Sequence, residues 1–390
     1  MILFEEAIQI INNQDCIPSS ETIEMRKSTS RILSSDLFSD MNMPPFDKSA
    51  VDGYACKRVN LLNELEVTGI IAAGSTSEKE IGEKQCIKIM TGAPIPKGAD
   101  CVIMVEETEI IRDNHIRFTG TKTNDNICFL GEDVKKDALV LKKGTLIRPQ
   151  EIAVIASVGA YQVSVFRQPT IGIISTGDEL VEPENIPSAS QIRNSNAWQL
   201  VAQAEQAGCI TNYYGIAKDN KADTKAKIEL SMSQNNITLL TGGVSMGDFD
   251  YVPEILHESG IEILFKSIAV QPGRPTLFGK KEDRFVFGLP GNPVSSFVQF
   301  ELLVKQLIYK LSGRINKPEF TPVIAGDSFK RKNISRKAFI PANFYKGQIF
   351  PVSYHGSAHI HAYTSANALV MMEIGQLEIK EGEWANVRFL

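Results

Sequence analysis

The chain has 390 residues, of which 43% are hydrophobic and 22% are charged, and its formal net charge is −5. This length exceeds that of one ordinary hydrophobic core, so we expect two to four domains. The sequence contains no basic stripe or arginine-rich run of the kind that a nucleic-acid backbone requires, which argues against nucleic acid as a partner.

The cysteines and the N-terminus indicate a reducing compartment. Six cysteines are scattered without a C-x-x-C pair, which argues against a zinc ribbon, a redox dithiol or a disulfide framework. The first residues, MILFEEAIQI, carry two glutamates where a secretory signal would carry basic residues, and no uncharged apolar run reaches membrane-spanning length. We therefore expect reduced, mostly buried thiols in a soluble cytoplasmic protein.

The N-terminal part predicts helices around a β-rich insertion. Apolar residues recur at helical spacing in FEEAIQIINNQ, and SSETIEM offers Ser19 or Ser20 as the cap of a second helix. Residues 60–148 contain short apolar runs separated by Gly, Pro, Asn and Asp, which are typical of strands. QEIAVIASVGAYQV then returns to helical periodicity and closes at Gly159.

Residues 169–313 alternate between strand and helix patterns, from PTIGIIS through ITLL and FVFGLP to a long helix that begins PVSSFVQF. This alternation predicts a doubly wound α/β domain with a largely parallel sheet. The predicted domains are an N-terminal domain of residues 1–168, with a helical unit (1–45 and 149–168) and a β-rich insertion (about 46–148), a doubly wound domain (169–316) and a small C-terminal β domain (317–390).

Three polar loops follow strands of the predicted sheet. They are ISTGDEL (174–180), TGGVSMGDFD (241–250) and GLPGNPVSS (288–296). In the third loop, Asn292 is expected to cap a helix that begins at Pro293. Because parallel sheets bind ligands at the carboxyl ends of their strands, we expect the three loops to converge on one pocket.

The second loop combines an anion cradle with acids. Gly242 and Gly243 let backbone N–H groups approach a phosphate, whereas nearby carboxylates would repel it unless a hard cation such as Mg²⁺ stood between them. A heterocycle with donor edges is a second, compatible explanation, because carboxylates also accept hydrogen bonds. A plain glycine turn, with Asp250 as a helix cap, is the competing structural interpretation. The carboxylates of this region are Asp178, Glu179, Asp248 and Asp250.

Two further stretches leave alternatives open. MPPFDKSAVDGYA (43–55) holds Asp47 and Asp52 in an irregular segment, which is either a plain connector or a loop delivered to a site. HGSAHIH (355–361) places two histidines at strand spacing, but no third ligand with suitable spacing is evident. A polar strand face therefore explains this stretch better than a metal site.

The ordered motifs FDKSAVDGYA, IMTGAPIPKGAD, GED, STGDEL, NSN, TGGVSMGDFDY, PGRP and GLPGNPVSS resemble the MoeA family, which includes the E domain of gephyrin. The resemblance covers essentially the whole chain. It implies insertion of molybdenum from molybdate into adenylylated molybdopterin, with Mg²⁺-dependent release of AMP. It also implies four subdomains, the third related to the MogA/MoaB fold, and an elongated homodimer with a composite site.

The same resemblance assigns roles to individual residues. The implied catalytic residues are Asp52, Thr91, Asp133, Glu179 and Asp250, and the implied metal ligands are Glu179, Asp248 and Asp250. The implied substrate-binding residues are Asp178, Asn194, Asp219, Gly242, Gly243, Ser245, Asp248, Arg274, Pro290, Pro293 and Ser357.

The chain departs from the family at positions that often carry cations. Many members have an arginine-rich run before GED and a lysine before PG, where this chain has Cys128, Leu130 and Gln271. Arg274 is the nearest available replacement for binding molybdate, and Lys266 is the second choice. Two alternative functions are a molybdopterin adenylyltransferase, which shares GGVSMGD-like loops, and a dimeric scaffold for a peptide partner. A molybdopterin adenylyltransferase and recipient molybdoenzymes are the expected protein partners.

Overall fold

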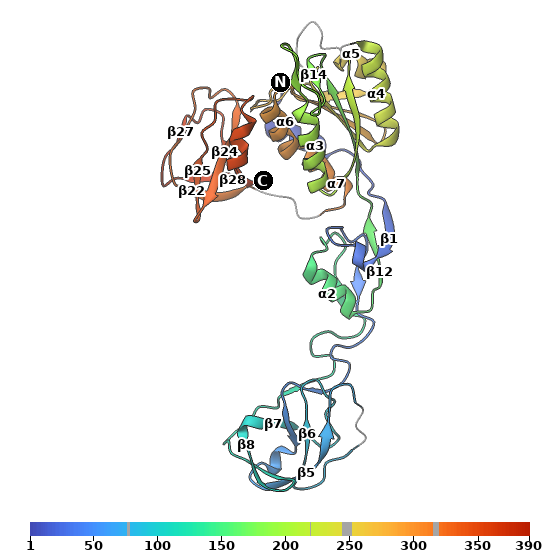
Figure 1. Cartoon of the computed structure of the whole chain (residues 1–390), viewed down its shortest axis with the longest axis vertical. Coiled ribbons are helices and arrows are strands. Elements are labelled where there is room, and N and C mark those ends of the chain that lie inside the picture. Colours follow the sequence, from blue (N-terminus) through green and yellow to red (C-terminus); the bar gives the residue numbers. More distant parts are fainter. Residues whose placement is uncertain (76–78, 219, 244–251, 315–319) are drawn as a thin grey trace.

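The computed structural model describes residues 1–75, 79–218, 220–243, 252–314 and 320–390. The molecule is elongated (Figure 1), with a β-rich unit at one end and the doubly wound domain at the other. A slender connector joins these two parts, and the C-terminal domain lies beside the doubly wound domain. Among the described residues, no helix is long and apolar enough to cross a membrane.

The doubly wound domain is built on a six-stranded sheet of order β16-β13-β17-β21-β20-β18. The first four strands pair in parallel, and β20 alone runs in the opposite direction, pairing antiparallel with β21 and β18. The expected largely parallel sheet is therefore confirmed. The strands are β13 (Thr170–Thr176), β16 (Ile210–Ala217), β17 (Ile237–Thr241), β18 (Glu262–Phe265), β20 (Leu277–Lys281) and β21 (Arg284–Leu289).

Helices cover both faces of this sheet because its central strands are apolar on both sides. Leu239 and Phe287 pack into one hydrophobic core, whereas the neighbouring residues Leu240 and Val286 pack into the other. The helices are α3 (Ser195–Gln206), α4 (Lys221–Gln234), α5 (Val252–Glu258), α6 (Pro293–Gln299) and α7 (Lys305–Leu311). A π-helical segment, Phe300–Val304, joins α6 to α7, so the predicted long helix is not a regular α-helix throughout.

The C-terminal domain is a small closed sheet that includes one strand from the preceding part of the chain. Strand β19 (Val270–Gln271) precedes the domain in the chain but pairs with its strand β24 (Lys337–Tyr345). The order β19-β24-β25-β22-β28-β26 closes through an additional β24–β26 pairing. The other strands are β22 (Thr321–Ala325), β25 (Gln348–Pro351), β26 (Ala368–Met372) and β28 (Trp384–Phe389), and β23 (Phe329–Lys330) pairs separately with β27 (Glu378–Ile379).

The connector contradicts part of the predicted helical unit. Helix α1 (Phe4–Asn12) forms as expected, but its buried face packs into the core of the doubly wound domain. Residues expected to begin a second helix form β1 (Ser20–Glu24), which pairs with β12 (Gln162–Phe166) because alternate residues such as Ile23 enter the connector core. The remaining elements are β2 (Leu37–Phe38), β11 (Leu139–Leu141) and α2 (Pro149–Ser157).

The β-rich unit is a six-stranded sheet of order β7-β4-β6-β5-β9-β8, with hydrophobic clusters on both faces. Strands were expected over residues 60–148, and the structure forms β5 to β11 within that range. Its strands are β4 (Gly53–Cys56), β5 (Glu64–Ile71), β6 (Gln85–Ile89), β7 (Cys101–Met104), β8 (Thr108–Arg112) and β9 (His115–Phe118), and β3 (Lys48–Ser49) pairs with β10 (Ile127–Cys128) beside it.

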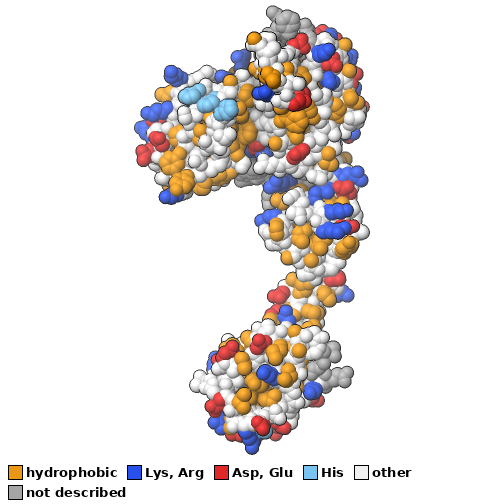
Figure 2. Space-filling view, in the orientation of Figure 1, with side chains coloured by type: hydrophobic (Ala, Val, Ile, Leu, Met, Phe, Trp, Pro, Cys, Tyr) orange, Lys and Arg blue, Asp and Glu red, His pale blue; other side chains and the backbone are white. Residues whose placement is uncertain are grey.

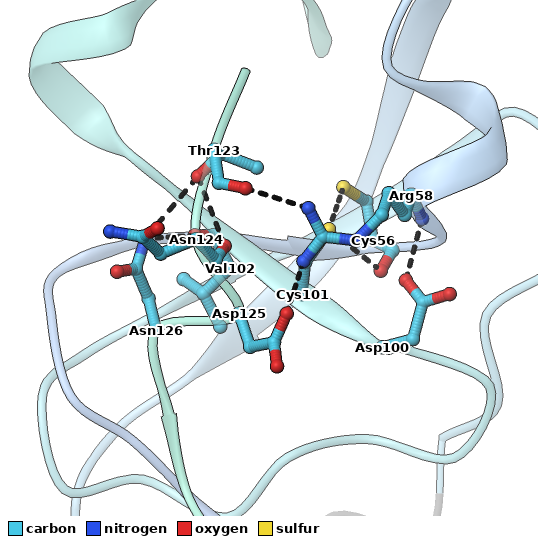
Figure 3. A network of polar contacts seen from close by, with 9 residues as sticks. All are labelled: Cys56, Arg58, Asp100, Cys101, Val102, Thr123, Asn124, Asp125 and Asn126. Atoms are coloured by element: carbon cyan, nitrogen blue, oxygen red, sulfur yellow. Dashed lines mark hydrogen bonds and ion pairs between the residues drawn. The ribbon is translucent and has the colours of Figure 1, made fainter.

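Arg58 ties the segment before β10 to the sheet (Figure 3). Its guanidinium donates to the carbonyl of Thr123 at 2.6 Å and forms an ion pair with Asp125. Its backbone N–H donates to Asp100 at 2.5 Å. Asn126 completes the anchor by donating from its side chain to the carbonyl of Val102 at 2.7 Å. These bonds fix the segment that leads directly into the loop of residues 129–133.

The cysteines are free thiols, as expected, and most are buried. Cys56, Cys86, Cys101 and Cys209 are buried, and the remaining two are partly exposed. Cys56 and Cys101 lie on paired strands with their sulfur atoms 3.7 Å apart. Burial raises the pKa of Cys86 to about 12, so this thiol is protonated at neutral pH.

We predict that Arg58→Met destabilises the β-rich unit by about 1–2 kcal/mol, because it removes a partly exposed ion pair and one charge-assisted hydrogen bond. Hydrogen exchange by mass spectrometry should show faster exchange in residues 120–133 than in the parent protein. Arg112→Met, at an exposed pair with Glu64 on the same sheet, is the matched control and should leave that segment unchanged. Equal exchange in both variants would contradict the proposed anchoring.

Candidate functional site

The three strand-end loops converge at one edge of the doubly wound sheet. The side-chain amide of Asn196 donates to the hydroxyl of Thr241 at 3.0 Å and to the carbonyl of Gly291 at 2.7 Å. The N–H of Gly242 donates to the carbonyl of Leu289 at 3.2 Å. Asn196 was not among the predicted site residues, and only its place in the NSN motif drew attention to it.

The glycines of the second loop are required by the backbone. Gly242 and Gly243 have positive φ angles of +92° and +63°, which residues other than glycine rarely adopt. A Cβ atom on Gly242 would also lie 2.7 Å from the carbonyl oxygen of Thr176. The loop thus brings its main chain close to the end of β13, as the sequence pattern predicts.

The predicted acids are only partly described. Asp178 and Glu179 are exposed and follow β13 directly, next to the glycine turn. The other predicted residues of this region, Asp219, Ser245, Asp248 and Asp250, lie outside the described residues. Within the described residues, no group of three or more His, Cys, Asp and Glu side chains is arranged to hold a metal ion. The ligand set therefore stays a prediction.

The side chain of Asn194 stabilises the start of α3. Its side-chain oxygen accepts from the N–H of Ala197 at 3.3 Å and from the hydroxyl of Ser175 at 3.0 Å. Its amide donates to the hydroxyl of Tyr213 at 2.7 Å. Because Asn194 is only 1% exposed, these bonds position the helix and the strand end beneath the loops. Its predicted contact with substrate stays a prediction.

A cavity of about 660 Å³ lies between the third loop and the C-terminal domain. Pro290 and Asn292 line it from the loop, and Ser357 lines it from the C-terminal domain. The amide of Asn292 donates to the hydroxyl of Ser357 at 3.0 Å instead of capping the helix that begins at Pro293. Asn292 thus occupies the predicted N-cap position, but the predicted side-chain cap is wrong, because Ser357 offers this amide a partner across the domain boundary.

The cavity is electropositive. Arg274 lines it together with Arg336, whose pKa is lowered by burial and by the charge of Arg274, although an arginine stays protonated at neutral pH. The side-chain oxygen of Gln271 is buried there without a hydrogen-bond partner in the described part of the chain. Lys266, the second predicted cation, is exposed and lines a different depression beside α5. Three further cations line the cavity, namely Lys330, Arg331 and Lys332.

Sequence reasoning missed Arg336 and the neighbouring cations. The only available signal was the dense basic run FKRKNISRK, which gives no indication that its residues face the PGRP segment. Arg331 has a supporting role, because its guanidinium donates to the carbonyls of Gln376 at 2.7 Å and Arg336 at 2.6 Å.

The nearby histidines do not form the predicted strand face. Residues 355–359 are irregular, and a 3₁₀ helix (Ile360–Ser365) follows. The rings of His355 and His359 stack with their centroids 5.2 Å apart, and histidines gather on the C-terminal domain in Figure 2. The strand face predicted for His359 and His361 is wrong, because small residues before His359 form a turn and His361 belongs to the 3₁₀ helix.

The predicted residues of the N-terminal half form a second group. Asp52 accepts hydrogen bonds from the backbone N–H of Thr91 at 2.7 Å and from its hydroxyl at 2.9 Å. These two bonds lower the pKa of Asp52. Asp133 lies in a neighbouring loop, which is held by a hydrogen bond from the N–H of Leu130 to Asp47 at 2.7 Å. The MPPFDKSAVDGYA stretch is therefore more than a plain connector, since it organises this loop.

The two groups of residues are distant within one chain. Asp52 and Thr91 flank strands β4 and β6 of the β-rich unit, whereas Gly242 follows β17 of the doubly wound domain. Figure 1 places these sheets at opposite ends of the molecule.

Comparisons with known proteins cover nearly the full length. The family model described as MoeA N-terminal region (domain I and II) matches residues 2–159, and that described as probable molybdopterin binding domain matches residues 172–310. A molybdopterin molybdenumtransferase of Staphylococcus aureus (strain Mu50 / ATCC 700699) is 34% identical over 98% of this chain and 94% of its own length. This chain belongs to the MoeA family of molybdopterin molybdenumtransferases.

Two further relatives support the assignment of this chain to the MoeA family. The molybdopterin molybdenumtransferase of Bacillus subtilis (strain 168) is 34% identical over 98% of this chain and 93% of that protein. A crystal structure of the molybdopterin biosynthesis MoeA protein from Pyrococcus horikoshii OT3 aligns over 100% of both chains, with a TM-score of 0.86 and 29% sequence identity. The multidomain α/β fold expected from the motifs is thereby confirmed.

We predict that Thr91→Val raises the pKa of Asp52 part of the way to its ordinary value, because the hydroxyl bond is lost while the backbone bond remains. A carboxylate with a lowered pKa contributes stability above its unfolded pKa of about 3.9, and this contribution is lost as the pH falls through the folded pKa. The stability difference between the parent protein and Thr91→Val should therefore disappear in acid.

Carbon-13 NMR of the aspartate carboxyl groups, with Asp52 assigned through Asp52→Asn, measures this pKa. Thr108→Val is the control, because its hydroxyl donates to the carbonyl of Val105 instead. A titration of Asp52 that is identical in Thr91→Val and the parent protein would show that the hydroxyl bond has no effect.

Proposed function

We propose that this MoeA-family protein inserts molybdenum from molybdate into adenylylated molybdopterin and releases AMP, yielding molybdenum cofactor. The observation that carries the proposal is the adjacency of a glycine cradle and an electropositive cavity. Pro290 and Asn292 of the third loop line the cavity, and Gly242 is hydrogen-bonded to Leu289 at the start of that loop. A phosphorylated pterin and an oxyanion can therefore occupy neighbouring positions.

The cavity is the proposed binding site for molybdate. A doubly charged oxyanion needs positive charge and several donors when water is partly excluded. Arg274 and Arg336 supply charge, and the hydroxyl of Ser357 and the amide of Asn292 supply neutral donors. Gln271 stands where many family members have a lysine. Arg274 and Arg336 together replace the positive charge of that lysine in the proposal.

The glycine loop is the proposed site for the phosphoanhydride. Exposed backbone N–H groups bind phosphate oxygens, and Asp178 and Glu179 stand at the neighbouring strand end. Carboxylate oxygens are the ligands that Mg²⁺ prefers, so these acids fit the ion, and Glu179 with Asp248 and Asp250 is the proposed ligand set. Mg²⁺ would neutralise phosphate charge during cleavage.

The site is proposed to be composite, formed by two copies of the chain in a homodimer. Asp52, Thr91 and Asp133 lie in the β-rich unit, far from the glycine loop of the same chain. A twofold arrangement can bring this group to the glycine loop of the partner. A cytoplasmic location and transfer of the product to recipient molybdoenzymes follow from the same proposal.

Incubation of purified protein with adenylylated molybdopterin, molybdate and Mg²⁺ tests the function directly. AMP release together with formation of molybdenum cofactor is the expected result. Adenylylation of molybdopterin from ATP would instead favour the alternative adenylyltransferase function. Peptide binding by a dimer with neither activity would favour a scaffold.

We predict that Arg274→Ala raises the molybdate concentration needed for half-maximal insertion about tenfold or more, because a charge-assisted hydrogen bond contributes about 1.5–3 kcal/mol. Affinity for adenylylated molybdopterin should change less. The matched control is Lys266→Ala, since Lys266 lies outside the cavity and should titrate like the parent protein. If Arg274→Ala also titrates like the parent protein, molybdate is held by other groups.

We predict that mixing Asp52→Asn chains with Glu179→Gln chains restores activity that neither variant has alone. In a random mixture half of the dimers are heterodimers with one intact site of two, so about a quarter of parental activity is expected. A chain carrying both substitutions, mixed with either single variant, is the control and should restore none. No recovery in verified heterodimers would indicate that each chain carries its own complete site.

A further inference from the structure

A second cavity, of about 480 Å³, lies in the β-rich unit and has no role in the proposed reaction. Its floor is a row of side chains across three neighbouring strands. Tyr54 on β4 pairs with Lys88 on β6, and Lys88 pairs in turn with Ile70 on β5. Ile110 and Ile116 from the β8–β9 hairpin form the opposite wall.

Accessible apolar side chains form part of the cavity wall, beside the polar residues Thr68, Asn114 and His115. Ile70 is 64% exposed and Ile110 is 77% exposed, although both line a concave surface. Val67 and Ile116 connect these walls to the hydrophobic cluster beneath. A ligand that covered the two exposed isoleucines would gain the free energy of burying apolar surface.

Two hydrogen-bond donors stand beside these walls without partners. Lys88 is half-buried, and within the described part of the chain its ammonium makes no hydrogen bond or ion pair. The hydroxyl of Tyr54 likewise has no hydrogen-bond partner there. Burial raises the pKa of Tyr54, so its hydroxyl keeps its proton and can donate at neutral pH. The ammonium of Lys88 and the neutral hydroxyl of Tyr54 can together bind one carboxylate.

We propose that this cavity binds a small amphiphilic carboxylate. The carboxylate accepts from the ammonium of Lys88 and the hydroxyl of Tyr54, and its aliphatic or aromatic body lies against Ile70 and Ile110. The volume falls within the range of small-molecule pockets, which is about 300–1,000 Å³.

Isoleucine-methyl NMR of the full chain tests this site with hexanoate as the probe. The methyl signals of Ile70 and Ile110 are assigned through Ile70→Val and Ile110→Val. Hexanoate should shift both signals saturably, and hexanamide, which has the same body without the charge, should bind about fivefold or more weakly. Equal affinities for the acid and the amide would overturn the proposal, as would the absence of shifts at these two methyl groups.

Variants separate the two donors. Lys88→Met keeps the aliphatic stem and should weaken hexanoate binding about fivefold or more, whereas Tyr54→Phe should weaken it about two- to threefold. Lys122→Met, at an exposed position of the same unit, is the matched control and should bind like the parent protein. Unchanged affinity in Lys88→Met would overturn the assignment. If that variant fails to fold, Tyr54→Phe and the comparison with hexanamide decide.

Discussion

The short pairing between β19 and β24 is the interaction on which the electropositive cavity depends. Val270 and Gln271 leave the doubly wound domain and join the sheet of the C-terminal domain at Lys337 and Ala338. The guanidinium of Arg336 strengthens the junction by donating to the carbonyl of Val270 at 3.2 Å. Because the PGRP segment follows β19 directly, this pairing sets the position of Arg274 relative to the other domain.

Opposite charges are kept apart along the proposed site. The acids at the end of β13 stand beside the glycine loop, whereas the arginines lie across the third loop, in a cavity shared with another domain. Asn196 links the second and third loops through Thr241 and Gly291. A neutral amide suits this place, because it holds both loops without adding charge to either region.

The sequence predicted the central sheet well because its signal is local. Apolar runs such as ITLL are followed at once by polar loops, and the convergence of those loops follows from parallel strand direction alone. The family resemblance named both Asp52 and Thr91 as functional residues, but it did not predict their hydrogen bond, which joins residues 39 apart along the chain.

The failures have a common physical cause, which is competition from partners distant in sequence. Ser20 begins a strand because β12 offers it a neighbour. Asn292 occupies the expected N-cap position, but its side chain bonds to Ser357 instead of to the helix. Arg336 was not predicted as a site residue because it lines the cavity only when the two domains are packed together. Local patterns carry no information about such partners.

The π-helical segment Phe300–Val304 sets the rotational phase of the last helix of the doubly wound domain. Each α-helical residue turns the chain by about 100°, and one residue added within a single turn rotates everything beyond it by that amount. Leu307 and Ile308 are fully buried in the present phase. A one-residue deletion in this segment would therefore turn apolar side chains of α7 toward water, so natural length variation should be tolerated less here than in the surrounding loops.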